Sequence, residues 1–424
     1  MARVKTKRRS RSRHKKKFRV RPIAKVKSKL RKKVVFLVID GLPDLPTGKT
    51  PLQSARKPNL DWLAKNGMCG EILPVERKRW SDLTKASVSH VAMLSLLGYD
   101  LKKANFKRGP LEAVGADIPY RSGWLALRCN FTTVDSELKI LDRRVGRNSQ
   151  GLDEITRYIN EQVHLSVKHI FMRTFEHRTV LILKENLSDK ITDSDPYYTW
   201  EKVKRVEPIS TEAARSARIV QEFIDKARQV MEYHPANEQR INNGLPPANY
   251  IITREAGNTL PALKSFVRKH KLSKAVCIAE NGVMKAVCML AGFDAITVPE
   301  MKFKQTSKFI FDQILNALAE YDFVFAHVKG PDEAAHDGDF FRKQQMIETI
   351  DEFLEDFKGF GGILVLTSDH ITSCKTKRHE FGHVPIIIYG KARDSVERFD
   401  EFSVKRGRLK LIDGKKLWKI IFGR

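Results

Sequence analysis

The hydrophobic positions of the chain fall into short apolar runs separated by longer amphipathic segments. The runs have the length of buried strands and are bounded by turn residues; they are Val34–Ile39, Asn249–Thr253, Ala275–Ala279, Ala295–Val298, Phe323–His327, Ile363–Thr367 and Val384–Tyr389. Patterns with a helical period lie between them, at Asn59–Lys65, Gly282–Leu290, Ser307–Glu320 and Phe341–Phe357. Strands that alternate with helices predict an α/β fold, in which a doubly wound, mostly parallel sheet carries helices on both faces.

Residues 121–245 follow a different pattern. Two strand candidates come first, then a helix, then two more strand candidates: Trp124–Val134, Leu138–Asp142, Leu152–Gln162, His169–Thr174 and Arg178–Lys184. Residues 206–245 are polar and helical. This order predicts a separate α+β domain inserted into the core, which then consists of residues 34–120 and 246–424.

The positive charge is concentrated at the N-terminus. The formal net charge is +28, and residues 1–33 hold 18 Lys/Arg and no Asp or Glu. Such an arm cannot bury a core, so we predict that it is disordered. Its composition suits contact with nucleic acid or another polyanion, or a nuclear or nucleolar address. An organellar presequence and a plain solubilising tail stay open as alternatives.

Several protein classes are excluded by what the pattern lacks. The longest apolar run, Val34–Ile39, has six residues, whereas a membrane-spanning helix needs about 20, and no secretory signal follows the basic arm. The five cysteines are odd in number and show no CxxC spacing. We therefore expect a protein of a reducing compartment, cytoplasmic in the simplest case, with no membrane partner.

Side chains of metal-binding types follow three of the predicted core strands. Ligands of an open parallel sheet collect beyond the carboxyl ends of its strands. The candidates at those ends and in the next loop are Asp40, Asp332, His336, Asp369, His370 and His379, with His327 and Lys329 nearby. Each of them taken singly also fits a turn, a helix cap or a core histidine. Together, three carboxylates and three imidazoles predict a site for two divalent ions such as Mn²⁺, Mg²⁺ or Zn²⁺.

A two-metal site of this kind typically acts on phosphoryl groups and then needs a nucleophile. The hydroxyl-rich start of the segment Thr84–Gly98 offers three candidates by type, Thr84, Ser87 and Ser89. Any of them could equally be a helix N-cap. The residues by themselves do not choose among the three.

A series of motifs resembles one family of enzymes, the archaeal-type 2,3-bisphosphoglycerate-independent phosphoglycerate mutases of the alkaline phosphatase superfamily. The resemblance runs in order from about Val34 to the C-terminus and leaves out only the basic arm. The motifs are VIDGLPD, KTPLQSARKPNLDWLAKNGMCG, LLGYD, RGPLEAVGADI, RCNFTTVD, LDRRVGR, TDSDP, HVKGPDEAAHDGD, TSDH and HVPIIIYG.

The resemblance implies an alkaline-phosphatase-like fold, two divalent metal ions and no 2,3-bisphosphoglycerate cofactor. It implies that one ion is held by Asp40, Asp369, His370 and the nucleophile, and the other by Asp332, His336 and His379. Mn²⁺ is the expected metal, with Mg²⁺, Zn²⁺ and Co²⁺ as alternatives. Counted without a gap from LLGYD, the nucleophile motif falls on Ser89.

The resemblance further implies that the enzyme interconverts 3-phosphoglycerate and 2-phosphoglycerate through a phosphoserine. We expect the inserted domain to be a lid that excludes water from this reaction. Guanidinium groups bind carboxylate and phosphate in bidentate fashion. The candidate substrate ligands are Arg128, Arg143, Arg144, Arg147 and, beside the metal ligands, Lys329.

The segment around Ser89 departs from the family pattern. His90 stands where the family usually has an acid, Met93 where it usually has a histidine, and Ser87-Val88 where it usually has Pro-Gly. Two alternatives to an active mutase therefore stay open. One is a metal-dependent phosphomonoesterase of the same superfamily. The other is a catalytically degenerate homologue that associates with nucleic acid through the basic arm.

Overall fold

A computed structural model of the chain describes residues 32–81, 88–101 and 107–423, which belong to one compact unit. The predicted disordered arm lies outside the described residues, apart from Lys32 and Lys33. The Lys33 carbonyl accepts a hydrogen bond from the Ile363 amide at 2.8 Å, so the fold begins before residue 34. No helix in the described part of the chain is long and apolar enough to cross a membrane.

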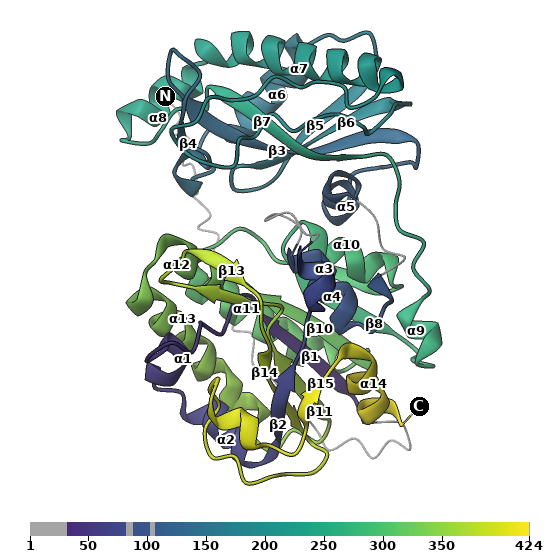
Figure 1. Cartoon of the computed structure of the whole chain (residues 1–424), viewed down its shortest axis with the longest axis vertical. Helices are drawn as coiled ribbons and strands as arrows, with labels where there is room; N and C mark the ends of the chain where they lie inside the picture. Colours follow the sequence, from purple (N-terminus) through teal and green to yellow (C-terminus); the bar gives the residue numbers. More distant parts are fainter. Residues whose placement is uncertain (1–31, 82–87, 102–106, 424) are drawn as a thin grey trace, which may run out of the picture. The chain divides into compact units, whose positions relative to one another are not determined.

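An eight-stranded sheet organises the core (Figure 1). Its strands, in spatial order, are β15 (Lys410–Ile412), β2 (Gly67–Ile72), β14 (Val384–Tyr389), β11 (Ile363–Thr367), β1 (Val34–Ile39), β10 (Phe323–Val328), β8 (Ala275–Ala279) and β9 (Asp294–Thr297). The five strands from β11 to β9 are mutually parallel, and β14 runs antiparallel to both of its neighbours. The predicted doubly wound, mostly parallel sheet is confirmed.

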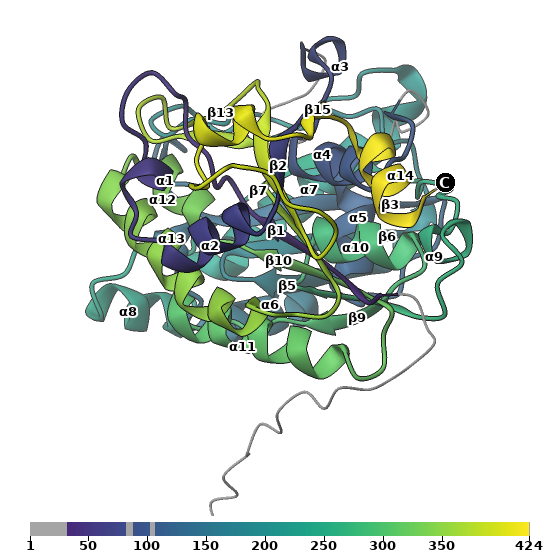
Figure 2. The same ribbon diagram turned by 90° about the horizontal axis from the view of Figure 1, so that it is seen from below.

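Both faces of this sheet are covered. Every residue of β1 is buried, including those whose side chains point to opposite faces. The side chains of Val34, Phe36 and Val38 belong to one apolar cluster, and those between them belong to another. Figure 2 shows the two helical layers on either side of the sheet. One layer contains α4 (Val88–Leu96), α9 (Phe266–Lys269), α10 (Val283–Leu290) and α14 (Gly414–Phe422); the other contains α2 (Pro58–Lys65), α11 (Phe303–Ala317) and α13 (Phe340–Phe353).

The shorter elements of the core connect these layers. They are α1 (Pro51–Ser54), α3 (Arg77–Ser81), α5 (Arg108–Gly115), α12 (Pro331–Asp337), the 3₁₀ turns η4 (Leu354–Phe357) and η5 (Ser403–Arg406), and the hairpin β12 (Ile371–Ser373) with β13 (Arg378–Glu380). Strands β2, β12, β13 and β15 were not predicted from the sequence. They are short, and β2 contains two glycines. At Gly70 a Cβ would lie 2.5 Å from the Lys410 carbonyl oxygen, so the glycine permits β15 to pair closely with β2.

The inserted domain is built on a second, antiparallel sheet. Its strands are β4 (Ile140–Asp142), β3 (Trp124–Val134), β6 (Arg178–Asn186), β5 (His169–Phe175) and β7 (Tyr250–Gly257), which pairs with β3. Helices α6 (Leu152–Gln162) and α7 (Ala214–Glu232) cover one face, and α5 contacts the other (Figure 1). The remaining elements are η2 (Val145–Arg147), η3 (Thr211–Ala213) and α8 (Pro235–Asn242).

One prediction about the core was wrong. Asn249–Thr253 was assigned to the core sheet, but β7 is hydrogen-bonded to β3 in the sheet of the inserted domain. A buried apolar run reveals that a strand is covered on both faces, yet it does not reveal which sheet the strand joins. The β-β-α-β-β order predicted for residues 124–184 is present as β3, β4, α6, β5 and β6.

Candidate active site

Three adjacent strands carry the candidate metal ligands to one edge of the core sheet. Strand β1 lies between β11 and β10 and is parallel to both, so their carboxyl ends lie side by side. Asp40 directly follows β1, Asp369 and His370 follow β11, and α12 begins three residues after β10. The structure therefore brings together residues that are more than 300 positions apart in the sequence.

The first group of ligand candidates consists of Asp40, Asp369 and His370, all of which are buried. The Nε2 atom of His370 lies 3.3 Å from an Asp40 oxygen and 3.2 Å from an Asp369 oxygen. Ser89, in the first turn of α4, places its Oγ 3.3 Å from the same nitrogen. The hydroxyl thus faces the ligand atoms of the first group.

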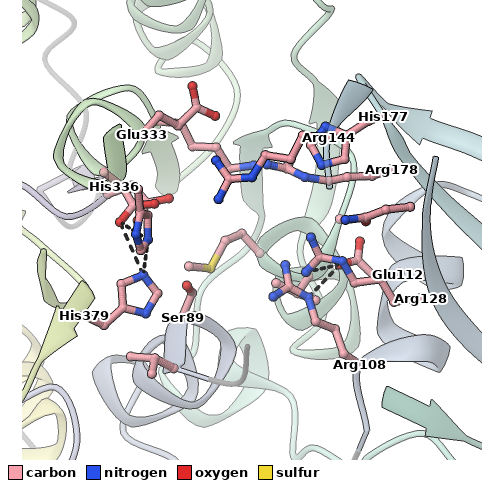
Figure 3. Close-up of a pocket in the computed structure, with 18 of the residues that line it drawn as sticks. Ser89, Arg108, Glu112, Arg128, Arg144, His177, Arg178, Glu333, His336 and His379 are labelled. Atoms are coloured by element: carbon pink, nitrogen blue, oxygen red, sulfur yellow. Dashed lines mark hydrogen bonds and ion pairs between the residues drawn. The ribbon is translucent and has the colours of Figure 1, made fainter. Parts of the chain in front are cut away.

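The second group consists of Asp332 and His336, one helical turn apart on α12, and His379 on β13. The Nε2 atoms of His336 and His379 are 3.0 Å apart. The same oxygen of Asp332 lies 3.5 Å and 3.4 Å from them. Figure 3 shows the two imidazoles facing each other. Asp332 and His336 are four positions apart in α12, a spacing that places both on one helical face.

The electrostatics of the first group fit a divalent cation. Burial, followed by repulsion from Asp369 and Asp332, raises the pKa of Asp40 well above its usual range. Burial and Asp332 raise the pKa of Asp369 to about 7. Among the described residues, one carboxylate oxygen of each of these two aspartates is buried and has no hydrogen-bond partner. Buried, unsatisfied carboxylates together with imidazole nitrogens are the donor set that Mn²⁺ or Zn²⁺ takes.

Gly41 is required by the close approach of the two groups. It adopts a φ of +58°, and a Cβ there would lie 2.6 Å from the Thr372 hydroxyl and 2.9 Å from Asp332. The Asp332 amide also donates a hydrogen bond to the Asp40 carbonyl at 3.1 Å. Any side chain at residue 41 would therefore separate the two halves of the site.

A cavity of about 490 Å³ opens on the Ser89 hydroxyl and both ligand groups. Its other walls come from the inserted domain and from α5 and α10 (Figure 3). All five predicted substrate ligands line it: Arg128, Arg143, Arg144, Arg147 and Lys329. Further lining residues that the sequence analysis missed are Arg108, Glu112, Asn130, His177, Arg178, Tyr197 and Arg254. The motif RGPLEAVG held Arg108 and Glu112, but nothing in the pattern separated them from ordinary surface charges.

Several of the cationic groups are neutralised by acids of this chain. Arg143 forms an ion pair with the fully buried Asp195. Arg128 lies 3.5 Å from Glu112, and Lys329 lies 2.6 Å from Glu280. A bound anion would have to compete with these acids for the guanidinium and ammonium groups.

Arg147 has a different partner, because it bridges the inserted domain to α12. Its guanidinium lies 3.0 Å from Asp337 and 3.7 Å from Glu333. This ion pair joins a predicted substrate ligand to the helix that carries Asp332 and His336. Arg147 therefore holds the inserted domain against α12, in addition to lining the cavity with a positive charge.

Arg144 lacks an ion-pair partner among the described residues, whereas Arg178 is compensated at longer range, because Glu176, Glu280, Glu333 and Glu112 raise its pKa against the effect of burial. No carboxylate among the described residues forms an ion pair with either guanidinium, and their side chains lie beside each other in Figure 3. Burial and then the neighbouring Arg147, Arg143 and Arg178 lower the pKa of Arg144 to about 10. The neighbouring His177 is neutral, because burial and Arg178 hold its pKa well below the usual range. This part of the cavity therefore carries positive charge from two guanidinium groups that form no ion pair among the described residues.

The residues that depart from the expected motif are both in the interior of the protein. His90 is 2% exposed, and burial with Arg108 nearby lowers its pKa to about 4, so its imidazole is neutral. Met93 is fully buried in the apolar cluster of the core. Of the other nucleophile candidates, Thr84 and Ser87 lie outside the described residues.

Comparisons with known proteins agree with this geometry. Residues 64–237 match the family model described as 2,3-bisphosphoglycerate-independent phosphoglycerate mutase. Enzymes named 2,3-bisphosphoglycerate-independent phosphoglycerate mutase from Methanosphaera stadtmanae and Methanocaldococcus jannaschii are 38% and 37% identical, over 92% of this chain and 97% and 96% of theirs.

Two solved structures share the fold over nearly the whole chain. The cofactor-independent phosphoglycerate mutase from Thermoplasma acidophilum has a TM-score of 0.58 and 30% identity, over 92% of this chain and 99% of that one. A protein from Pyrococcus horikoshii has a TM-score of 0.72 and 27% identity, over 93% of this chain and 97% of that one.

Proposed function

Because the chain belongs to the family of 2,3-bisphosphoglycerate-independent phosphoglycerate mutases, it interconverts 3-phosphoglycerate and 2-phosphoglycerate, and we propose that it does so through a phosphoserine formed at Ser89. The observation that carries the proposal is the position of the Ser89 hydroxyl. It lies 3.3 Å from His370 Nε2 and opens on the cavity that holds the guanidinium groups of Arg144 and Arg178. The proposed nucleophile, the proposed cation ligands and the proposed anion ligands therefore lie around one cavity.

The donor chemistry implies divalent cations. We assign one to Asp40, Ser89, Asp369 and His370, and a second to Asp332, His336 and His379, with Mn²⁺ as the preferred metal. When bound, such cations lower the pKa of a serine hydroxyl and stabilise negative charge on phosphoryl oxygens. The unsatisfied oxygens of Asp40 and Asp369 support this assignment.

The chain's own part in the reaction is a double displacement at phosphorus. Ser89 Oγ loses its proton and attacks the phosphate of 3-phosphoglycerate, so that an Oγ–P bond forms and the bond from phosphorus to O3 breaks. The departing oxygen takes up a proton, which leaves glycerate in the cavity. The O2 hydroxyl of glycerate then loses its proton and attacks the phosphoserine, the Oγ–P bond breaks, Ser89 Oγ takes up a proton, and 2-phosphoglycerate forms.

Glycerate has to be retained between the two steps, and we assign this to Arg144 and Arg178. Charge-assisted, bidentate hydrogen bonds to a carboxylate are the strong ones available to a guanidinium. Neither guanidinium forms an ion pair with a carboxylate among the described residues, although four glutamates stabilise the Arg178 charge from a distance, so the anion does not have to displace a paired acid. The walls of the cavity also hold cations that are paired with acids of this chain, namely Arg128, Arg143 and Lys329. We expect these to bind the substrate more weakly.

Water has to be excluded while the phosphoserine exists, since hydrolysis would give a phosphatase instead of a mutase. Contacts between the inserted domain and the core support a lid role for residues 121–245. Arg147 binds Asp337 at 3.0 Å, and Arg173 binds Glu300 at 2.8 Å. These ion pairs join the inserted domain to the core at two places.

The direct test is Ser89→Ala with Ser95→Ala as the matched control on the same helix. We expect Ser89→Ala to lose activity by on the order of a thousandfold or more, and Ser95→Ala to retain it. Product analysis by phosphorus NMR separates 2-phosphoglycerate from inorganic phosphate, and mass spectrometry of the quenched enzyme locates the phosphoserine. Activity retained in Ser89→Ala, or phosphate released as the main product, would contradict the proposal.

The basic arm supports a separate proposal, that residues 1–33 bind a nucleic acid or another polyanion. Its 18 Lys/Arg without any acid suit contact with a phosphate backbone. We expect a chain that lacks residues 1–31 to lose salt-dependent binding to RNA or heparin while its mutase activity is unchanged. Equal binding by the truncated chain would assign the polyanion contact elsewhere, and loss of nuclear accumulation on truncation would identify an address.

A further inference from the structure

The hydroxyl of Thr372 contacts one ligand candidate from each of the two groups. Thr372 is fully buried in the middle of β12. Its Oγ1 donates a hydrogen bond to an Asp332 oxygen at 2.7 Å and lies 3.0 Å from His370 Nδ1. Asp332 belongs to the second group and His370 to the first. This hydroxyl is not the nucleophile, a proposed cation ligand or a proposed substrate ligand.

The direction of the two hydrogen bonds is fixed by the number of protons. A hydroxyl has one proton, and here it goes to the Asp332 carboxylate. The contact with His370 is then a hydrogen bond only if the imidazole Nδ1 carries a proton and donates it. The other ring nitrogen, Nε2, is left with a free lone pair, and it faces Ser89 and the oxygens of Asp40 and Asp369.

The same hydroxyl also orients the second group. The Asp332 oxygen that accepts its proton is the one that lies 3.5 Å from His336 and 3.4 Å from His379. A carboxylate oxygen has a second lone pair, which remains available for a cation. One side chain thus selects the nitrogen that His370 presents and the orientation in which Asp332 presents its oxygen.

Thr372 is itself held rigidly by the chain. Its backbone pairs with His379 across the β12–β13 hairpin. The buried ammonium of Lys343 donates hydrogen bonds to the carbonyls of Thr372 at 2.7 Å and Pro43 at 3.0 Å. The absence of a side chain at Gly41 leaves the space that the hydroxyl occupies. The position of the hydroxyl is therefore set by the fold before any cation binds.

We propose that Thr372 is a positioning residue that couples the two cation sites, so that ordering the ligands of one site orders those of the other. Two like-charged ions would by themselves bind in separate steps, the second weaker than the first. A shared hydrogen-bond chain reduces that difference, because the first cation fixes His370 and, through Thr372, Asp332. The inference rests on the two-cation site of the proposed function.

The test is isothermal titration of the metal-free full chain with Mn²⁺. Thr372→Val removes the hydroxyl and keeps the shape, whereas Thr372→Ser keeps the hydroxyl. We expect Thr372→Val to weaken Mn²⁺ binding at both sites by about tenfold or more and to separate uptake into two resolved steps. Thr372→Ser should bind within about threefold of the unchanged protein.

Thr133→Val is the matched control, because Thr133 is also a buried threonine on a strand, and its hydroxyl donates to the Pro247 carbonyl at 2.7 Å, within the inserted domain. It should lower the unfolding midpoint of the metal-free protein about as much as Thr372→Val and leave Mn²⁺ binding unchanged. Mn²⁺ binding by Thr372→Val that is unchanged, or weakened at one site only, would overturn the coupling. If the unchanged protein takes up fewer than two Mn²⁺ ions, the two-cation site of the proposed function fails, and the coupling fails with it.

Discussion

Replacement of Arg144 by methionine should stabilise the free protein and weaken substrate binding at the same time. Most single substitutions lower stability. Arg144 differs because it is half-buried, has no acidic partner among the described residues, and is close enough to other guanidinium groups to be perturbed by them. Methionine keeps most of the apolar stem and removes the charge.

The size of the effect follows from the pKa of Arg144. Burial, together with Arg147, Arg143 and Arg178, lowers it from 12.5 to about 10. A tenfold change corresponds to about 1.4 kcal/mol, so keeping this guanidinium charged disfavours the folded state by on the order of 3 kcal/mol. Some packing is lost in the variant, and we therefore expect the unfolding free energy to rise by about 1 to 3 kcal/mol.

The effect on binding has the opposite sign. A hydrogen bond to a charged group contributes about 1.5 to 3 kcal/mol, which corresponds to a rise in KM of about 10- to 150-fold for 3-phosphoglycerate. The assay is a forward mutase reaction coupled to enolase, and stability is measured by urea denaturation of the same preparations. Both measurements use the metal-loaded full chain.

Arg143→Met is the matched control, since it removes a guanidinium from the same loop that is neutralised by Asp195. Asp195 is fully buried and would keep the Arg254 guanidinium at 3.4 Å and the Tyr197 amide, which donates to it at 2.8 Å. We expect this variant to lose about 1 to 3 kcal/mol of stability, because a buried carboxylate loses its better partner. If Arg144→Met is destabilised as much as Arg143→Met and its KM is unchanged, the identification of Arg144 as an uncompensated anion ligand is refuted.

Three further predictions concern the metal site, a buried ion pair and the loop that carries Arg147. In the metal-free protein the pKa of Asp369 is raised to about 7, so protonation of this carboxylate favours the folded state. The unfolding midpoint should therefore fall as the pH rises from about 4 through 7, while Mn²⁺ binding strengthens from about pH 6 to 8. An unfolding midpoint that rises between about pH 4 and 7 would contradict the raised pKa of Asp369. Glu112→Gln should lose about 3 to 5 kcal/mol in urea denaturation, because Glu112 is 2% exposed and binds Arg108 at 2.7 Å; a loss below about 1 kcal/mol would show that the pair is dispensable. Arg240→Met should raise KM about tenfold with a smaller change in kcat. The buried Arg240 guanidinium donates hydrogen bonds to the carbonyls of residues 145, 148 and 150 and so positions the loop that carries Arg147. Rescue by Arg240→Lys would show that a positive charge suffices without the planar guanidinium.

The sequence by itself determined the architecture of the core and the family. Apolar runs located β1, β8, β10, β11 and β14, since a strand buried on both faces has to be apolar at nearly every position. The rule that ligands gather at the carboxyl ends of parallel strands then selected the same six residues that the structure places in two groups. Both inferences work because they depend on local pattern and on the polarity of the chain.

Only the tertiary structure decided which partner each buried group has. The first half of β7, Tyr250–Thr253, is as apolar as a core strand, yet β7 pairs with β3, because strand pairing is set by contacts distant in the sequence. The motif LDRRVGR presents its arginines as equivalent, but Asp195 and Asp337 neutralise two of them and leave Arg144 uncompensated. The position of the Thr372 hydroxyl between His370 and Asp332 is likewise set by the fold and not by a local sequence pattern. The charge and hydrogen-bonding state of a buried side chain depend on neighbours that only the folded chain brings within reach.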